Sequence, residues 1–369
     1  MFASGIECSA PLVDGRRVDE LEKTGHYQRL DPDLDLVARF GLRYLRYGIP
    51  FHRVNPQPGH YDWDFPDRAL GALRRLGITP IVELMHFGVP DDLQTFQNPH
   101  VVSRFTVYAR AFAERYPWVR YYTVVNEPLI TATFSARFGF GNEQRKDDRS
   151  FVRALLTAAR CVVLGRRALE AIRPDALFLQ SDSCEYYHPV HPGAIQRAEF
   201  LNELRFAAFE LFLGRRLPAS VAEYLLRNGA SRDELGWFEL HGDDSRLIAG
   251  NDYYAASEKE LLADGSVREA GKLVGYYLLA RQYHERLGLP FLLTTSAAGD
   301  GAADWLGSLW GDARTLLQEG YPMRGFSWSG FINQPGLVDL ERQPTPIWAA
   351  FGSLVDSMRP PTREFPLAA

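Results

Sequence analysis

The sequence predicts a single (β/α)8 barrel, the TIM-barrel class, that spans residues 1–369. Three observations predict it: apolar runs of strand length alternate with amphipathic helical stretches, the runs number eight, and no linker, repeat or low-complexity segment divides the chain. The main alternative is a doubly wound open sheet. That alternative is disfavoured because the first apolar run is not followed by the G-x-G-x-x-G phosphate fingerprint.

The elements follow one another in a regular order along the chain. The eight candidate strands are residues 2–8, 43–49, 80–86, 121–127, 176–182, 247–254, 291–296 and 324–330. The candidate helices between them include residues 33–41, 68–77, 104–116, 153–172, 201–217, 271–288 and 303–320. Several of these helices end at Gly or just before Pro, as helices that lead into short loops do.

Composition narrows the classes of partner. The chain is 46% hydrophobic and 24% charged, with a formal net charge of -5, and it has no run of Lys and Arg that would attract nucleic acid or an anionic membrane. Cys8, Cys161 and Cys184 are odd in number and lack C-x-x-C spacing, so neither a disulfide framework nor a thiolate zinc site is predicted. No signal peptide or membrane-spanning run is evident, and we expect a soluble cytoplasmic protein that binds a small molecule.

Function in such a barrel is expected at the carboxyl ends of the strands. The strand ends are rich in carboxylates, aromatic rings and hydrogen-bonding groups, and none carries a phosphate cradle. The candidate residues at or just beyond them are Glu7, Arg46, His86, Asn126, Glu127, Asp182, Glu185, Asp252, Tyr254, Thr294, Thr295 and Trp328.

The run "YYTVVNEPLI" carries the clearest chemistry. Its strand is apolar up to Val125, so Glu127 is expected beside the barrel axis, where desolvation would raise its pKa toward the range of a general acid. Asn126 has an amide that can hold a ligand hydroxyl, and Pro128 fixes the backbone as the chain leaves the strand. The alternative interpretation of Glu127 is a solvated carboxylate at the start of a loop.

With these residues the sequence resembles glycoside hydrolase family 1, the β-glucosidases and their relatives, over most of the chain. "TVVNEP" resembles the family's T-x-N-E-P, which implies that Glu127 is the acid/base beside Asn126. "LRYG", "ELMHFGVPDDL", "NDYY" and "GFSWSGFIN" resemble four further strand-end motifs of the family. They imply substrate-site roles for Arg46, His86, Tyr254 and Trp328, with Asp252 where the family has Asn.

Two departures from the family pattern limit what the resemblance implies. The family's seventh strand ends in I-T-E-N-G, whose Glu is the nucleophile, and in "FLLTTSAAG" that position falls on Thr295 or, in the other register, on Thr294. The family's D-N-F-E-W run, which grips distal sugar hydroxyls, is replaced by "INQPG", with Pro335 and Gly336. Ordinary retaining hydrolysis is therefore not expected, because a threonine hydroxyl is a poor nucleophile without a base.

Additional acids stand near the first and fifth strand ends. Glu7, Asp182 and Glu185 resemble those of a short bacterial branch of family 1-like proteins, and each could act in catalysis, clamp a ligand or pair with an arginine. The run "EYYHPVH" places Glu185 near His188 and His191, but it lies in a Pro-containing loop rather than on one helix face. We therefore expect neither a metal nor a cofactor.

Three functions remain open at this point. The first is a sugar- or glycoside-processing enzyme that uses Glu127 with one of Glu7, Asp182, Glu185 or Asp252, including inverting hydrolysis. The second is a non-hydrolytic isomerase, lyase or cyclase that acts on a related small molecule by acid/base chemistry. The third is an inactive, carbohydrate-binding pseudo-glycosidase.

Overall fold

The computed structural model describes residues 1–297, 299, 301–332 and 336–357. Eight strands form its centre: β1 (Phe2–Ile6), β4 (Tyr44–Gly48), β5 (Thr79–Glu83), β6 (Tyr121–Thr123), β7 (Leu177–Ser183), β9 (Leu247–Asp252), β12 (Phe291–Thr295) and β13 (Met323–Trp328). They close in the order β1-β13-β12-β9-β7-β6-β5-β4, and β1 pairs in parallel with both β13 and β4. The predicted (β/α)8 barrel is confirmed, and each of the eight predicted strands overlaps an observed one.

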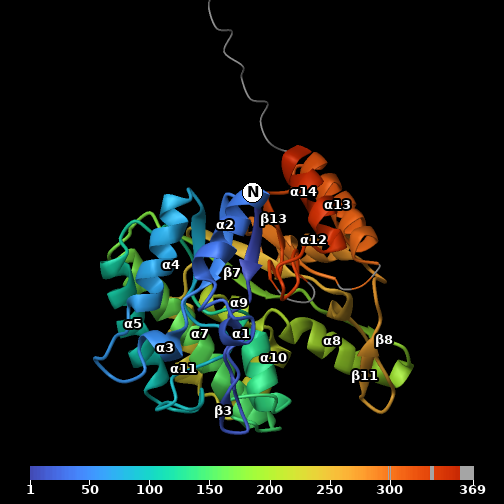
Figure 1. Ribbon diagram of the computed structural model, residues 1–369. Helices are drawn as coiled ribbons and strands as arrows, with labels where there is room; N and C mark the ends of the chain where they lie inside the picture. Colours follow the sequence, from blue (N-terminus) through green and yellow to red (C-terminus); the bar gives the residue numbers. More distant parts are fainter. Residues whose placement is uncertain (298, 300, 333–335, 358–369) are drawn as a thin grey trace, which may run out of the picture.

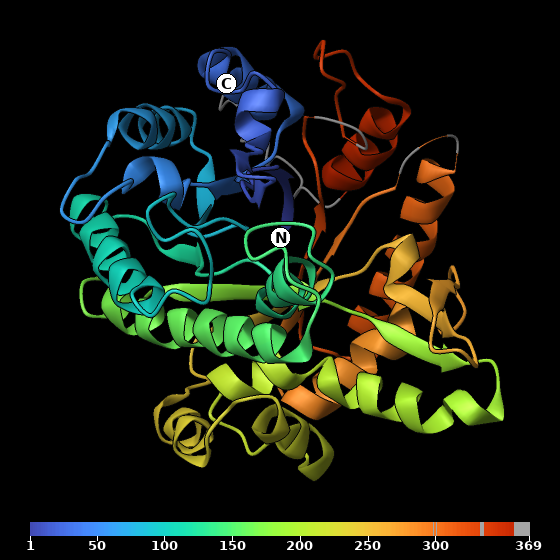
Figure 2. The same ribbon diagram turned by 90° about the horizontal axis from the view of Figure 1, so that it is seen from below.

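Helices surround this barrel, and seen from below they form a ring through which the chain passes once, from blue to red (Figure 2). The α-helices are α1 (Glu20–Lys23), α2 (Leu30–Phe40), α3 (Phe51–Val54), α4 (Asp64–Arg75), α5 (Val101–Arg115), α6 (Pro128–Ala132), α7 (Asp148–Glu170), α8 (Ile195–Leu204), α9 (Ala207–Phe212), α10 (Ala219–Arg227), α11 (Arg232–His241), α12 (Tyr276–Leu287), α13 (Ala302–Gln318) and α14 (Pro346–Ser357). A π-helix, η1 (Thr133–Arg137), continues α6, and two 3-10 turns are η2 (Pro192–Ala194) and η3 (Ala255–Ser257).

Two small sheets stand outside the barrel. One contains β8 (Tyr186–Pro189), β10 (Glu258–Leu261) and β11 (Val267–Glu269), in the order β11-β10-β8. The other is the hairpin of β2 (Leu12–Val13) and β3 (Arg16–Arg17). Both lie in the lower half of Figure 1, toward which β1 runs from the N-terminus. Because β8 and β10 follow the ends of β7 and β9, the three-stranded sheet extends the rim of the barrel on that side.

The hydrophobic core lies mainly between the barrel and its helices. Helix α5, for example, buries Phe105, Tyr108 and Phe112, whose spacing of three and four residues places them on one face. A separate cluster fills the inside of the barrel with Ile81, Leu179 and Leu292. These three come from alternate strands, the arrangement of a filled barrel layer. The polar groups at the strand ends therefore lie above a packed apolar layer inside the barrel.

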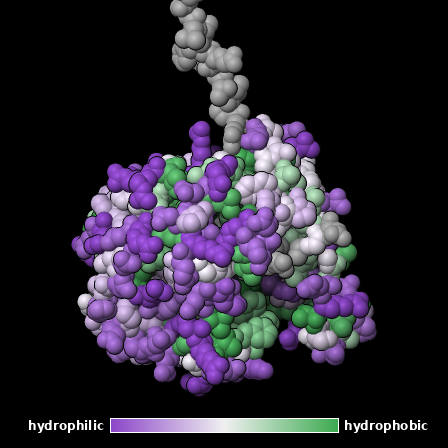
Figure 3. Space-filling view, viewed as in Figure 1, coloured by the Kyte–Doolittle hydropathy of each residue, from purple (hydrophilic) through white to green (hydrophobic). Residues whose placement is uncertain are grey.

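The outer surface shown in Figure 3 is mostly hydrophilic, and apolar residues are exposed on it only in small groups. Among the described residues, we find no helix with the length and apolar character needed to span a bilayer.

One glycine in the barrel is required by a close approach of two strands. Gly250 of β9 pairs with Ser181 of β7, and a Cβ at position 250 would lie 2.5 Å from the Cβ of Ser181 and 2.8 Å from its Cα. The Ser181 hydroxyl donates a hydrogen bond to Asn126, so this residue is held in place. The missing side chain at Gly250 therefore makes room for a residue that supports the polar interior.

We predict that Gly250→Ala lowers the free energy of unfolding by about 1–3 kcal/mol, because the added methyl group overpacks the interface between β7 and β9. Gly236→Ala is the matched control. Gly236 lies inside α11 and a Cβ there would meet no atom within 4 Å, so this change should stabilise the protein by about 0.5–1 kcal/mol. Urea unfolding of both variants measures the difference, and equal effects of the two substitutions would contradict the prediction.

Candidate active site

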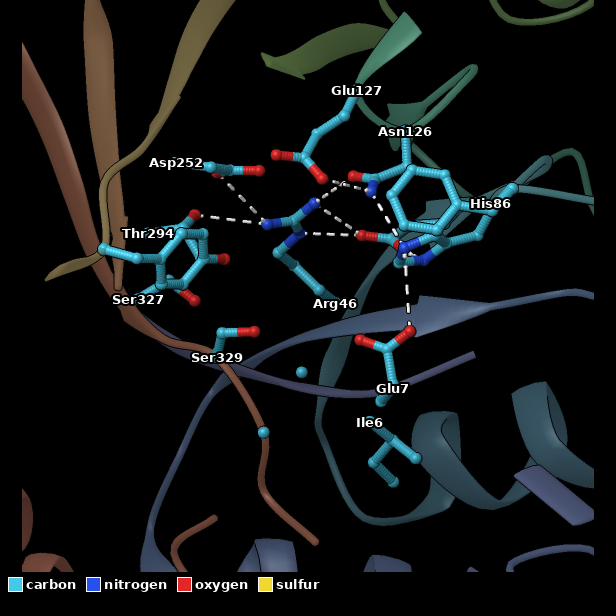
Figure 4. Close-up of a pocket in the computed structure, with 15 residues that line it drawn as sticks. Ile6, Glu7, Arg46, His86, Asn126, Glu127, Asp252, Thr294, Ser327 and Ser329 are labelled. Atoms are coloured by element: carbon cyan, nitrogen blue, oxygen red, sulfur yellow. Dashed lines mark hydrogen bonds and ion pairs between the residues drawn. The ribbon is translucent and has the colours of Figure 1, made fainter. Parts of the chain in front are cut away.

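A polar pocket lies at the carboxyl ends of the barrel strands and holds about 520 Å³ of space, its open mouth included. Figure 4 shows its side chains converging from several strands. The side chains that line it are those of Ile6, Glu7, Arg46, Glu83, His86, Phe87, Asn126, Glu127, Asp252, Tyr254, Thr294, Ser327 and Ser329. Eight of the twelve predicted site residues are among them: Glu7, Arg46, His86, Asn126, Glu127, Asp252, Tyr254 and Thr294.

The buried guanidinium of Arg46 links the strands around the pocket. Its Nε donates a 2.8 Å hydrogen bond to Glu83 Oε1, and its Nη2 lies 2.7 Å from the same oxygen. Nη2 also donates to Asn126 Oδ1 at 2.8 Å, and Nη1 donates to Thr294 Oγ1 at 3.1 Å. Nη1 is 3.7 Å from Asp252 Oδ1. Arg46 therefore connects groups from β5, β6, β9 and β12 (Figure 4).

Glu83, which sequence reasoning did not single out, is the main counter-charge of Arg46. Burial alone would raise its pKa, but Arg46 and a hydrogen bond from His86 outweigh burial and bring the pKa to about 2. Its Oε2 lies 3.0 Å from His86 Nδ1 and 3.4 Å from the Cys8 thiol. The signal in the sequence is a lone carboxylate inside the apolar run "PIVELM". Such a residue can be buried only with a compensating partner.

The amide of Asn126 is oriented by its neighbours. Its Oδ1 accepts hydrogen bonds from Arg46 Nη2 and from the Ser181 hydroxyl, which directs Nδ2 toward His86 Nε2 at 2.9 Å. The same Nδ2 is 3.5 Å from Glu127 Oε2. Asn126 thus joins the histidine on β5's end to the carboxyl group of Glu127.

Glu127 is the N-cap residue of α6, in the segment that follows β6, and has an unusual backbone conformation. Its φ is 42°, in the left-handed region that non-glycine residues rarely adopt, and such local strain is concentrated at functional sites. Burial raises the pKa of Glu127 well above its usual value, and the negative charges of Asp252 and Asp182 raise it further. Glu127 therefore keeps its proton to higher pH than an ordinary glutamate does, which suits a general acid.

Asp252 ends β9 and faces Glu127 across the pocket (Figure 4). Burial raises its pKa, whereas Arg46 and hydrogen bonds from Thr294 and Ser181 act in the opposite direction. Among the described residues its Oδ1 has no hydrogen-bond partner. In the barrel register Asp252 pairs with Thr294 of the neighbouring strand, so a carboxylate stands beside one of the two threonines that end β12.

Glu7 and Tyr254 complete the predicted residues of the pocket. Glu7 Oε1 accepts a hydrogen bond from the Ser9 backbone N–H and lies 3.6 Å from His86 Nε2. Burial would lower the pKa of His86, but the charges of Glu7 and Glu83 raise it overall. Burial raises the pKa of Tyr254 well above its usual value, so its hydroxyl stays protonated and can donate a hydrogen bond.

Asp182 lies beside the pocket but does not line it. Its Oδ2 accepts a 2.8 Å hydrogen bond from the backbone N–H of Leu129, and its Oδ1 accepts one from Ser183 at 3.0 Å. Burial raises its pKa to about 8 despite these donors. Because Leu129 begins the turn that follows Glu127, Asp182 fixes the position of Glu127 and also acts on its pKa.

Three other predicted residues are placed away from the pocket. Glu185 forms an ion pair with Lys259 and accepts a hydrogen bond from Tyr187 at 2.8 Å, in a second pocket. Thr295 is fully buried and accepts a hydrogen bond from Trp305 Nε1 at 2.9 Å. Trp328 is also fully buried, and its ring packs against Phe351 of α14.

Possible metal ligands are grouped beside the pocket rather than in the "EYYHPVH" run. Cys8, Glu83 and His86 have ligand atoms within 4.8 Å of one another, but these atoms already hydrogen-bond each other. His188 instead contacts Glu258 at 2.8 Å, and His191 accepts a hydrogen bond from the Gly193 N–H. Glu185, His188 and His191 therefore face different partners. Of the "INQPG" run, residues 333–335 lie outside the described part of the chain.

Comparisons with known proteins agree with this architecture. The sequence profile of Glycosyl hydrolase family 1 matches residues 17–168. β-Glucosidase A of Thermotoga maritima is 24% identical over 82% of this chain and 77% of its own length. β-Glucosidase 42 of Arabidopsis thaliana is 27% identical over 72% of this chain and 60% of its own length.

Solved structures of β-glucosidases share the fold of this chain. The structure of the β-glucosidase from Thermotoga maritima in complex with deoxynojirimycin superposes with a TM-score of 0.80 at 19% sequence identity, covering 90% of this chain and 87% of that one. That enzyme's complex with glucoimidazole also gives a TM-score of 0.80. The profile match, the relative aligned over most of both chains and the shared barrel make this chain similar to glycosyl hydrolase family 1 and give it a glycosidase-like barrel.

Proposed function

We propose that the protein hydrolyses a glycoside with Glu127 as the general acid and Asp252 as the general base. The observation that carries the proposal is the pair of facing carboxyl groups in the pocket, each with a raised pKa, with the Arg46 guanidinium beside them (Figure 4). The relatives named as β-glucosidases support a glycoside as the substrate class.

The groups around the two carboxyl groups indicate which of them is protonated and which is ionised. Two buried acids that repel each other share one proton most readily, and the proton stays on the acid with fewer stabilising partners. Arg46, Thr294 and Ser181 all favour the charged form of Asp252. For Glu127, burial and the negative charges of Asp252 and Asp182 favour the neutral form and outweigh the opposing charge of Arg46. We therefore assign the shared proton to Glu127.

In the proposed reaction, Glu127 donates its proton to the glycosidic oxygen as the bond from that oxygen to the anomeric carbon breaks. Asp252 accepts a proton from a water molecule, whose oxygen forms the new bond to the anomeric carbon from the opposite face. The products are the free sugar and the protonated leaving group. Glu127 ends as a carboxylate and Asp252 as an acid, and exchange with solvent resets both.

The position of Asp252 favours inversion over the family's double displacement. An aspartate carries its carboxylate one methylene nearer the backbone than a glutamate, and Asp252 stands on the strand next to Thr294. Its carboxylate is thus set back from the place of the family's nucleophile. The added space suits the water molecule that an inverting pair of carboxyl groups requires.

We predict that Glu127→Gln lowers kcat/KM about 10²- to 10⁴-fold on alkyl or phenyl glycosides, whose leaving groups need protonation. The loss should be much smaller on 2,4-dinitrophenyl glycosides, because that leaving group departs without a proton. Glu223→Gln on α10, an exposed position, is the matched control. Equal losses on both substrate types would contradict the assignment of Glu127 as the acid.

Asp252→Asn should lower kcat/KM about 10²- to 10⁴-fold on both kinds of glycoside, since activation of water does not depend on the leaving group. Asp264→Asn in an exposed turn is its control. Proton NMR of the first product should show the inverted anomer. A retained anomer would disprove the inverting mechanism, a product of unchanged mass would indicate an isomerase or cyclase, and sugar binding without turnover would indicate a binding protein.

The pH profile of kcat/KM should be bell-shaped. Activity should fall as pH decreases because Asp252 must be ionised, and it should fall as pH rises above the elevated pKa of Glu127 because the acid must be protonated. In Asp252→Asn the neighbouring negative charge is lost, so the pKa of Glu127 should decrease and the alkaline limb of the residual activity on phenyl glycosides should move to lower pH. If the alkaline limb did not move, the charge of Asp252 would not be what raises the pKa of the catalytic acid, which would contradict the pairing of Glu127 with Asp252.

A further inference from the structure

A second pocket of about 820 Å³, its open part included, lies between the segment that follows Glu127 and the three-stranded sheet at the rim. Much of its wall is apolar. The apolar side chains that line it are Leu129, Ile130, Phe134, Phe138, Phe151, Leu201, Leu204, Leu261 and Val267. Phe134 and Phe138 are large apolar residues that remain 40% and 42% exposed, respectively. A concave pocket with exposed apolar side chains is typical of a ligand site.

The charged side chains in the wall are mostly cationic. Arg137, Arg197, Arg205 and Lys259 line the pocket, against the single carboxylate of Glu185. Lys259 forms an ion pair with Glu185, so the negative charge is already compensated. Arg205 is 5% exposed and donates to the Glu185 backbone carbonyl at 2.6 Å and to Gln282 at 2.8 Å. The pocket therefore has an apolar wall and an excess of fixed positive charge.

Arg197 differs from the other cations because it is not engaged. It is exposed, on α8, and it has no hydrogen bond or ion pair to any described residue. Arg137, by comparison, is 3.2 Å from Asp148. A free guanidinium at the edge of an apolar pocket can bind an anionic group without breaking an existing ion pair.

The second pocket is separate from the sugar pocket but adjoins it. Among the described residues, none lines both. Leu129 and Ile130 of its wall follow Glu127 within α6, which stands between the two pockets. The ring of Phe134 is 6.2 Å, centroid to centroid, from that of Phe87, which lines the sugar pocket. A ligand in the second pocket would thus contact the helix that positions Glu127.

We propose that this pocket is a second binding site, whose ligand is a small amphipathic anion with a flat apolar body and one carboxylate or sulfonate group. The apolar body would lie against the phenylalanine and leucine side chains. The anionic group would face Arg197 and Lys259. This site does not depend on the reaction proposed above for Glu127 and Asp252.

The test compares two fluorescent probes of similar size on the intact protein: anionic 8-anilinonaphthalene-1-sulfonate and neutral N-phenyl-1-naphthylamine. The anionic probe should bind saturably with one site per chain. Arg197→Gln should raise its Kd about threefold, and Lys259→Gln about tenfold because Glu185 would then repel the anion. Glu185→Gln should lower the Kd about threefold, because Lys259 is released from its ion pair.

The neutral probe and a distant arginine provide the controls. Affinity for N-phenyl-1-naphthylamine should change less than about twofold in the three variants, since charge does not contribute to its binding. Arg39→Gln, an exposed change on α2, should leave both affinities unchanged. Unsaturable binding of the anionic probe, equal affinities in all variants, or parallel changes for the two probes would overturn the proposal. Circular dichroism of each variant verifies that it is folded.

Discussion

The buried guanidinium of Arg46 is the interaction on which the catalytic face of the barrel depends. A charge inside a barrel is tolerated only when its hydrogen-bonding groups are satisfied, and Glu83, Asn126 and Thr294 provide that satisfaction from three different strands. The same contacts orient the Asn126 amide and lower the pKa of Glu83. Burial raises the pKa of both Glu127 and Asp252, and the charge of Arg46 offsets this effect only in part.

The fold could be predicted from sequence because each strand and helix leaves a local pattern of apolar residues, and this pattern is repeated along the chain. Alternation of strand-length and helix-length runs located all eight barrel strands, and the strand-end rule brought Arg46, Asn126 and Glu127 to one face. What a linear sequence does not contain is the direction of each side chain. The β12 strand shows this well: Thr294 reaches the pocket, whereas Thr295, one residue further, points outward to Trp305 because side chains alternate along a strand.

Other site features depended on partners that are distant in sequence. Glu83 lies in an apolar run and is explained only by Arg46, 37 residues away. Glu185 has a strand-end position like the pocket acids, but Lys259, 74 residues later, holds it in the second pocket. Asp182 supports the turn after Glu127 by accepting hydrogen bonds from backbone N–H groups. Contacts of this kind leave no pattern of side chains in the sequence. Each role is set by tertiary contacts, which a single sequence does not specify.

The pairing of Asp252 with Thr294 has an implication for protein engineering. Placing a glutamate at position 294 would add a third acid to Glu127 and Asp252 beside a guanidinium that is already paired with Glu83. Their mutual repulsion would hold more than one of them protonated at neutral pH. That single change therefore would not add a fully ionised carboxylate to the site. A double replacement that also makes position 252 an asparagine is the smallest change that keeps the number of carboxyl groups in the pocket unchanged.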